Sequence, residues 1–403
     1  MTSFDPSALL TARTRTADEG AIIRMAQKSR DLRAKGMDVV SLTVGEPDFD
    51  TPDHIQQEAT AAMKAGFTHY SPVQGIPELR AALSRKLKAE NNLDYSAAEI
   101  SVTNGAKQAI ANAVLSLIDE GDEVIMLAPF WVSYEITVRF AGGTPVVLPA
   151  SVEEDYKVPA SRIAAAVTPQ TKLLILNSPS NPTGAVWSAK ELEAIADIVR
   201  AHPRLMVLSD EIYEYIMFDG RMASIGALPG MRERTITVNG FSKGFAMTGW
   251  RLGFAAAVEP VTKAMVRMQG TITTGANQFV QRAAIAALEG PREEVERMRL
   301  RYRARRDMVL AGLRAIEGVR IGSIPATFYA FPDVSALLGR KAGNHVMDTT
   351  DRLCDWLLEE HGVAVVPGTA FGAPGSIRLS FAASEADIQK ALGRISSALN
   401  SLV

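Results

Sequence analysis

A lysine in a loop of small residues is the sequence feature with the clearest chemical potential. Lys243 stands in the stretch Asn239-Gly-Phe-Ser-Lys-Gly-Phe-Ala-Met-Thr-Gly-Trp-Arg-Leu-Gly253, directly after an expected strand. The small neighbours leave room for a ligand, and an accessible, partly unprotonated amine forms Schiff bases with carbonyl compounds. Ser242 and Arg251 bracket the lysine, so a hydroxyl and a guanidinium can both reach one phosphate group. A lone lysine in such a loop is usually only solvated, but this combination predicts a reactive amine beside a phosphate site.

Other polar and aromatic residues follow apolar runs that are typical of strands. Asp210 ends the run Met206–Asp210, Asn181 lies in the Asn- and Pro-rich stretch 177–184, and Trp131 follows a third run. Ligands bind at the carboxyl ends of strands in open α/β sheets, which makes these residues candidate binding groups. Each also has a structural interpretation: a helix N-cap for Asp210, a turn-rich loop for 177–184 and core filler for Trp131.

A further candidate is the stretch Thr103-Asn-Gly-Ala-Lys-Gln108, where a strand turns into a helix. Helix N-termini offer unpaired backbone N–H groups and a partial positive charge, which suit a phosphate. An ordinary glycine turn explains Gly105 equally well. The stretch therefore indicates a phosphate site only together with Ser242 and Arg251.

The elements that must position these groups alternate along the middle of the chain. Short apolar runs, typical of strands buried on both faces of a parallel sheet, occur at Ile100–Thr103, Val124–Leu127, Leu173–Leu176, Met206–Leu208 and Thr235–Val238. Helical patterns such as Ala106–Ile118 and Ala189–Arg200 separate them. The alternation predicts an α/β fold with helices on both faces of the sheet.

A second, smaller unit is expected from the N-terminal arm and the region after residue 290. Strand-like pieces lie at Ala326–Phe331, Val363–Val366 and Ile377–Phe381, followed by a C-terminal helix. The stretch Arg292–Ile316 reads as a long helix whose early acids suit the helix dipole. Its six later arginines (297, 299, 301, 303, 305 and 306) fit a solvated face better than a nucleic-acid site, because the chain is not basic overall.

Composition narrows the class of protein. The 403 residues are 47% hydrophobic and carry 43 basic against 45 acidic side chains, so no general field attracts nucleic acid or anionic membrane. A single cysteine, Cys354, cannot form an internal disulfide and fits a reducing compartment. No apolar run approaches the ~18 residues of a membrane span, and the N-terminus lacks the apolar segment of a secretory signal. We expect a cytoplasmic enzyme with neither membrane nor nucleic-acid partners.

Five separated motifs, running from Gly45-Glu-Pro-Asp-Phe49 to Arg378, together resemble the class I aminotransferases, which are pyridoxal-phosphate enzymes of fold type I. The most specific is Gly240-Phe-Ser-Lys243 followed by Gly249, Arg251 and Gly253. The bacterial aspartate/prephenate aminotransferases resemble the chain most. The resemblance implies a large domain with a mostly parallel seven-stranded sheet (residues 48–290), an N-terminal arm (1–47) and a small α+β domain (291–403).

The resemblance also implies a role for each candidate residue, with no metal required. Lys243 is the cofactor lysine and general base, Asp210 pairs with the pyridinium nitrogen, and Tyr213 and Asn181 bind the cofactor's 3-oxygen. The phosphate is held by Gly105, Ala106, Ser242 and Arg251, and by Tyr70 of a neighbouring subunit in a homodimer with shared active sites. Trp131 stacks on the ring. The substrate is bound by Gly45, Lys107, Trp131, Asn181 and the carboxylate clamp Arg378.

The substrate is the least determined part of this interpretation. Lys107 matches a lysine that binds the distal carboxylate in the aspartate/prephenate subgroup, which favours aspartate as donor and 2-oxoglutarate as acceptor in a ping-pong reaction. The arm Asp18-Glu-Gly-Ala-Ile-Ile-Arg24 departs from that subgroup, so aromatic or broad specificity stays open. Two rival functions use the same fold: a C–S or cyclising lyase, and a cofactor-binding regulator. The regulator is disfavoured by the intact lysine and by the roughly forty residues before Gly45, too few for a DNA-binding domain.

Overall fold

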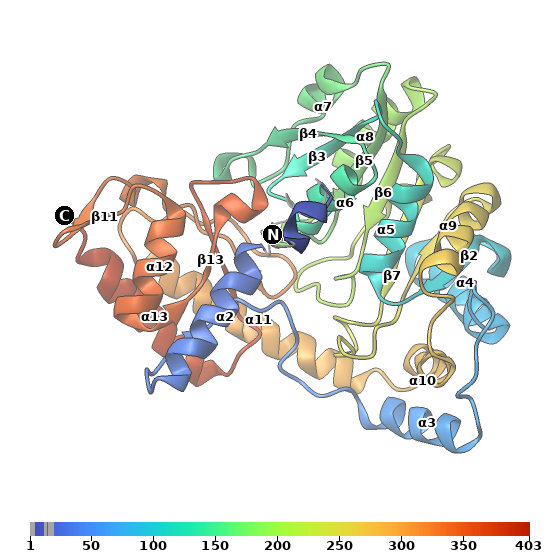
Figure 1. Ribbon diagram of the computed structural model, residues 1–403, viewed down its shortest axis with the longest axis horizontal. Helices are drawn as coiled ribbons and strands as arrows, with labels where there is room; N and C mark the ends of the chain where they lie inside the picture. The colour runs from blue at the N-terminus through green and yellow to red at the C-terminus, as the bar shows by residue number, and fades with distance from the viewer. Residues whose placement is uncertain (1–4, 12–13, 15–19) are drawn as a thin grey trace.

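The computed structural model describes residues 5–11, 14 and 20–403, and all statements about elements concern these ranges (Figure 1). Asp18 and Glu19, which belong to the atypical arm, lie outside them. Within them, no helix combines the length and apolar character needed to cross a membrane.

A seven-stranded sheet forms the centre of the larger part of the molecule. Its strand order is β2-β8-β7-β6-β5-β3-β4, and β8 alone runs antiparallel to its neighbours. The strands are β2 (Ile100–Thr103), β3 (Glu123–Ala128), β4 (Thr144–Pro149), β5 (Thr171–Asn177), β6 (Met206–Asp210), β7 (Thr235–Gly240) and β8 (Gly253–Ala256). The predicted mostly parallel seven-stranded sheet is confirmed.

Helices cover both faces of this sheet, because alternate strand residues are apolar on each side. In β5, Leu173 and Ile175 pack with α5 (Ala106–Leu117), α6 (Ser133–Phe140) and α9 (Glu259–Ile272). Leu174 and Leu176 face the other way, toward α7 (Ala160–Ala166) and α8 (Ala189–Ala201). The continuous apolar runs of the sequence thus reflect burial on both faces.

Three further helices pack together beside the sheet. α3 (Asp53–Lys64) and α4 (Pro77–Asn91) both contact α10 (Gln278–Glu289). Figure 1 shows α3 and α10 at the lower edge of the molecule, where the blue N-terminal chain passes beneath the sheet.

The two ends of the chain meet in the smaller part of the molecule. β1 (Val40–Ser41) pairs in parallel with β12 (Val363–Ala364), and β13 (Val366–Pro367), β14 (Ile377–Ser380) and β9 (Tyr329–Ala330) form an antiparallel sheet. Its helices are α2 (Ala21–Ala34), α11 (Glu293–Arg314), α12 (Thr350–His361) and α13 (Glu385–Asn400), and Figure 1 shows blue α2 beside this orange and red group. The domain boundaries at 47/48 and 290/291 remain a prediction.

Short elements connect these parts. β10 (Lys341–Ala342) and β11 (His345–Val346) form a small hairpin. Single 3-10 turns lie at Pro6–Leu9, Ala97–Glu99, Val152–Glu154, Ile225–Ala227, Arg232–Arg234, Ser335–Leu337 and Gly368–Phe371.

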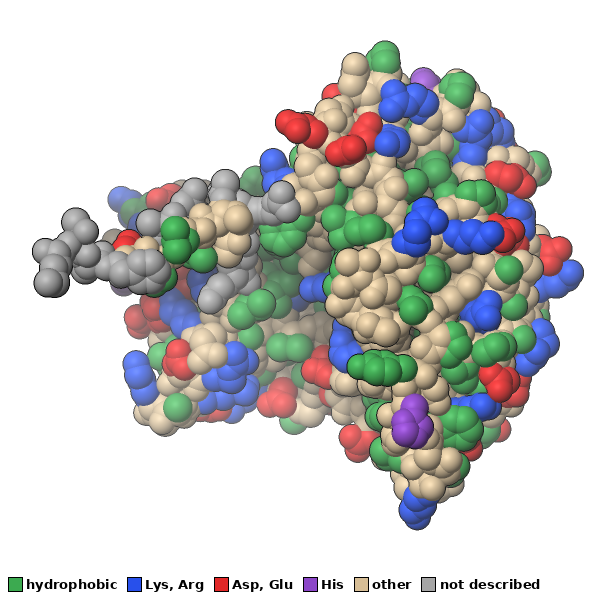
Figure 2. All heavy atoms as spheres, turned by 45° about the vertical axis from the view of Figure 1, so that its right-hand side comes forward, with side chains coloured by type: hydrophobic (Ala, Val, Ile, Leu, Met, Phe, Trp, Pro, Cys, Tyr) green, Lys and Arg blue, Asp and Glu red, His purple; other side chains and the backbone are tan. Residues whose placement is uncertain are grey.

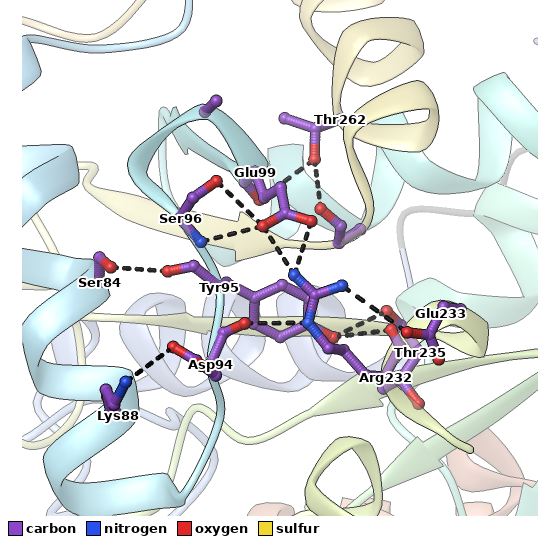
Figure 3. Close-up of polar contacts among 12 residues, drawn as sticks. Ser84, Lys88, Asp94, Tyr95, Ser96, Glu99, Arg232, Glu233, Thr235 and Thr262 are labelled. Carbon is purple, nitrogen blue, oxygen red and sulfur yellow. Dashed lines mark hydrogen bonds and ion pairs between the residues drawn. The ribbon is translucent and has the colours of Figure 1, made fainter.

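A polar network fixes the start of β2, the strand that leads to the predicted phosphate loop (Figure 3). Nη2 of Arg232 lies 2.8 Å from both carboxylate oxygens of Glu99, and its guanidinium covers the ring of Tyr95 at 5.0 Å. The Tyr95 hydroxyl donates to the Arg232 carbonyl at 3.1 Å. The network anchors an edge strand whose other end carries Gly105.

Two sequence expectations are wrong in detail. Val363–Val366 is not one strand but two, β12 and β13, which belong to different sheets. The arginines of α11 do not all face solvent: Arg305 and Arg306 are buried. They are buried because each finds a carboxylate partner on another segment, Asp48 and Asp219 respectively.

Candidate active site

A pocket of about 810 Å³ lies between the carboxyl ends of the central strands and the smaller part of the molecule. Figure 2 shows the surface hollowed on this side, with hydrophobic and basic side chains around the recess. Most residues predicted for the site line it together: Gly45, Ala106, Lys107, Trp131, Asn181, Asp210, Tyr213, Ser242, Lys243, Arg251 and Arg378. Residues from both ends and the middle of the chain therefore meet in one cavity.

Lys243 lies at the base of this pocket, in the turn that follows β7. Its amine donates to the Gly45 carbonyl at 2.5 Å and lies 5.9 Å from the ring centres of Tyr213 and Phe328. Burial lowers the pKa of Lys243 to about 8, against the charge of Glu46, which raises it. A buried amine with this pKa is unprotonated in an appreciable fraction of molecules near neutral pH, as a nucleophile or general base requires.

Asp210 projects from the carboxyl end of β6. Its Oδ2 accepts a hydrogen bond from the Tyr134 hydroxyl at 2.7 Å, and its Oδ1 accepts one from the Ile212 amide at 3.2 Å. Burial raises the pKa of Asp210 to about 6, while these two hydrogen bonds lower it. The side chain is therefore mostly ionised at neutral pH and offers a carboxylate to a cationic or N–H group in the pocket.

The start of α5 and Arg251 form a compact cradle for an anion. Gly105 caps α5 with a φ of 85°, and a Cβ there would lie 2.6 Å from Nη2 of Arg251. A Cβ on Gly253 would lie 2.4 Å from the Ala106 amide nitrogen. Glycine at both positions lets the guanidinium and a helix N-terminus approach closely, which is the arrangement that binds phosphates.

Arg378 lies on β14 and is 1% exposed. Its Nη1 donates to Oδ1 of Asn181 at 3.1 Å and its Nη2 donates to the Thr43 carbonyl at 2.5 Å, whereas its Nε has no partner among the residues that the structure describes. Its guanidinium lies 4.7 Å from the ring centre of Tyr329. A buried guanidinium with an unpaired N–H at the pocket wall is suited to bind a carboxylate, so this strand arginine does not belong to the outer surface.

The remaining predicted residues form the mouth and the walls of the pocket. The amine of Lys107 lies 4.9 Å from the centre of the Trp131 ring, and burial, with a smaller effect of Arg251, lowers the pKa of Lys107. The hydroxyl of Tyr213 lies 2.9 Å from that of Tyr329. The Asn181–Pro182 bond is cis.

Tyr70 is the exception among the predicted residues. It is 89% exposed and borders a separate hollow formed by residues 67–71 and 273–279. The predicted role of Tyr70 concerns the site of a neighbouring subunit, so its place outside the pocket of its own chain agrees with that role without testing it.

Sequence reasoning missed several pocket residues. Tyr134 contacts Asp210, and Tyr329 contacts Tyr213. Asn177 donates to the Asp210 carbonyl at 2.9 Å. Glu46 accepts a hydrogen bond from the Thr248 hydroxyl. Asn177 begins the stretch 177–184 named above, Tyr134 lies three positions after Trp131, and Glu46 directly follows Gly45, so proximity to a predicted residue was an available signal. Tyr329 had none, because it is far in sequence from every motif.

Comparison with known proteins gives consistent matches along the chain. Residues 37–395 match the family described as aminotransferase class I and II. The aspartate/prephenate aminotransferase of Cereibacter sphaeroides is 42% identical over 376 residues, which is 93% of this chain and 94% of that protein.

Solved structures show the same likeness. The aspartate aminotransferase of Rhizobium meliloti superposes with a TM-score of 0.94 at 38% identity and covers 100% of both chains. The aspartate aminotransferase of Thermus thermophilus with maleate has a TM-score of 0.91 at 43% identity, and the match covers 96% of this chain and 99% of that one.

Proposed function

Since this chain belongs to the class I and II aminotransferase family, we propose that it moves the amino group of aspartate to 2-oxoglutarate with pyridoxal 5′-phosphate as its cofactor. The observation that carries the proposal is one pocket holding a lysine of lowered pKa, an anion cradle and a buried arginine. These are the three groups needed to bind a carbonyl cofactor, its phosphate and a substrate carboxylate.

The residues present fit this cofactor. Glycines at 105 and 253 leave a cradle that a Cβ would fill, and Ser242 and Arg251 supply a hydroxyl and a fixed positive charge beside it. Asp210 offers a buried carboxylate for the ring nitrogen, and Trp131 offers a flat apolar face. When bound, pyridoxal phosphate supplies a carbonyl carbon for amines and a ring that accepts the electron pair released at the substrate Cα.

The residues of the pocket have distinct roles in the proposed reaction. Arg378 binds the α-carboxylate of the amino acid and fixes the orientation of the Cα–H bond, with Asn181 holding the guanidinium in place. Lys243 takes the proton from Cα of the substrate, since its amine is buried and of lowered pKa. Asp210 stays ionised through the Tyr134 hydrogen bond and stabilises positive charge on the ring nitrogen.

Lys107 supports the choice of a dicarboxylate substrate. It lines the pocket beside Trp131 and supplies the cation that a distal carboxylate needs. Gly20, Ile22 and Ile23 of the arm also line the mouth, so an aromatic side chain finds apolar partners there. Aromatic amino acids or prephenate are therefore the second substrate class.

We further propose a cytoplasmic homodimer with shared active sites. Tyr70 is 89% exposed and is not among the described residues that line the 810 Å³ pocket of Lys243. A tyrosine at this position serves the site of a second subunit. The buried free thiol of Cys354 is compatible with a reducing compartment.

The decisive experiment is an absorption spectrum of the purified protein with pyridoxal phosphate, followed by aspartate or phenylalanine without any keto acid. We expect a visible band that depends on Lys243, is lost on conversion to pyridoxamine phosphate, and is lost faster with aspartate. A faster reaction with phenylalanine would move the assignment to aromatic substrates. A band that never converts would favour a lyase or a regulator, and no band would overturn the proposal.

A further inference from the structure

The buried arginine Arg305 of α11 forms an ion pair that the reaction does not use directly. Its Nη1 and Nη2 contact Oδ1 and Oδ2 of Asp48 at 2.7 and 2.8 Å, a two-pronged geometry. Its side chain is 7% exposed, and its guanidinium lies 5.1 Å from the centre of the Phe49 ring. A paired and stacked guanidinium of this kind fixes the segment to which it is bound.

Asp48 belongs to the segment of residues 42–51, called the strap below. On one side it is held by the smaller part of the molecule: the Ser380 amide donates to the Leu42 carbonyl at 2.8 Å, and Arg378 donates to the Thr43 carbonyl. Arg305 on Asp48 completes this set of anchors. The strap is therefore attached before and after Gly45.

On its other side the strap contacts the lysine loop. The amine of Lys243 donates to the Gly45 carbonyl at 2.5 Å, and the Thr248 hydroxyl donates to Glu46. Further along, the Thr51 hydroxyl donates to the Ala246 carbonyl at 2.6 Å. The Gly45 carbonyl that accepts the hydrogen bond of the lysine thus lies between two anchored points.

We propose that Arg305 is a positioning residue which, through Asp48, fixes the Gly45 carbonyl and Glu46 against the amine of Lys243. The inference rests on the proposed role of Lys243 as the reacting amine. Since a glycine has no side chain to hold it, the position of its carbonyl depends on the anchors of the strap. Of the contacts that attach the strap to the smaller part of the molecule, the ion pair of Asp48 with Arg305 is the one that follows Gly45 in sequence.

The charges around Lys243 determine the direction of the effect. Glu46 and Asp210 favour the ammonium form, whereas Arg251 and Arg378 disfavour it. Loss of the Asp48 anchor loosens the contacts of the Gly45 carbonyl and the Glu46 carboxylate with the amine and leaves both arginines in place. The amine then loses its proton at a lower pH.

The test measures the proton affinity of Lys243 in the full-length chain after hydroxylamine has removed any bound carbonyl compound. Cyanate, which reacts only with unprotonated amines, is added at a series of pH values, and carbamylation of Lys243 is followed by peptide mass spectrometry. The midpoint of the pH dependence is compared, because accessibility alters the absolute rate but not the midpoint. We expect a midpoint near pH 8 in the unaltered protein.

Arg305→Met and Asp48→Asn are expected to lower the midpoint, so that the ratio of unprotonated to protonated amine at pH 7 rises about three- to tenfold. Asp48→Asn keeps the size of the side chain and serves if Arg305→Met fails to fold. The matched control is Arg306→Met. Arg306 is also buried on α11, but it donates to Asp219 and to the Ile324 carbonyl, away from the strap.

An unchanged midpoint in Asp48→Asn, or an equal shift in Arg306→Met, would overturn the proposal in favour of a purely structural ion pair. Cyanate requires neither cofactor nor amino acid. The result therefore stands apart from the spectral test of amino transfer, and failure of either one is recognisable by itself.

Discussion

Tyr134 donates its hydroxyl proton to Oδ2 of Asp210 at 2.7 Å, and both side chains are buried. The bond joins α6 to the end of β6. It acts against burial, which by itself raises the pKa of Asp210. The carboxylate proposed to face the cofactor ring therefore depends on a neighbour from another element for its ionisation.

Tyr134→Phe removes this donor and raises the pKa of Asp210 further above its present value of about 6. We expect the acidic limb of the kcat/KM profile to move upward by about 0.5–1 pH unit, the size of one lost hydrogen bond. Tyr95→Phe is the control, because Tyr95 is also a buried donor but lies in the network of Figure 3, away from the pocket. An acidic limb that stays in place would contradict the role of Tyr134.

Glu211 is a buried carboxylate next to Asp210, and burial raises its pKa to about 7 although Ser224 and Ser209 donate to it. Because the pKa in the folded protein exceeds the ordinary glutamate value of 4.5, the stabilising contribution of protonated Glu211 is full below pH 4.5 and is lost as the pH rises through 7. Glu211→Gln should therefore raise the free energy of unfolding by up to about 3 kcal/mol above pH 8 and change it little at pH 4. Urea unfolding across this range measures the difference, with the exposed Glu317→Gln as control.

Lys107→Ala tests the distal carboxylate site. A charged hydrogen bond to the substrate contributes about 1.5–3 kcal/mol, so the KM for aspartate should rise about ten- to a hundredfold while that for phenylalanine changes much less. Steady-state kinetics with both donors provide the comparison. Lys263→Ala removes an exposed lysine that pairs with Glu259 on α9 and should alter neither constant. Equal effects of Lys107→Ala on both donors would exclude Lys107 from the distal site.

Gly253→Ala tests the anion cradle. Its Cβ would lie 2.4 Å from the Ala106 nitrogen and 2.7 Å from the Gly105 carbonyl carbon, so backbone must move at the start of α5. We expect a loss of about 1–3 kcal/mol in stability, as in other overpacked sites, and at least tenfold weaker binding of pyridoxal phosphate in equilibrium titration. A Cβ on Gly393 of α13 would have no neighbour within 4 Å in the part of the chain that the structure describes, so Gly393→Ala should stabilise the chain slightly. Normal cofactor affinity in Gly253→Ala would contradict the cradle.

Local sequence patterns predicted most of the fold. The apolar runs located β2, β3, β5, β6 and β7, since a strand buried on both faces leaves a short continuous signal. β4 and β8 were missed: β4 is a half-exposed edge strand, and the four residues of β8 overlap the end of the lysine motif. The resemblance to aminotransferases, which the family match confirms, supplied the strand number that local patterns did not.

The features that could not be predicted from the sequence depend on contacts between residues far apart in the chain. Arg305 and Arg378 both look like surface residues in a local pattern, yet each is buried by a partner far away in the chain, Asp48 and Asn181 respectively. The same holds for Tyr329, which meets Tyr213 across 116 positions. Such contacts become visible only when the sheet and the smaller part of the molecule are assembled.

The pairing of β1 with β12 sets an order for biosynthesis. β1 can pair only after Val363, the partner of Val40, has been translated. At about 5–20 residues per second, translation of the intervening residues takes on the order of 20–60 s. All seven strands of the central sheet leave the ribosome within that interval. Thr43 likewise meets Arg378 only after 335 further positions have been translated, so the site around Lys243 stays unfinished in the nascent chain until then.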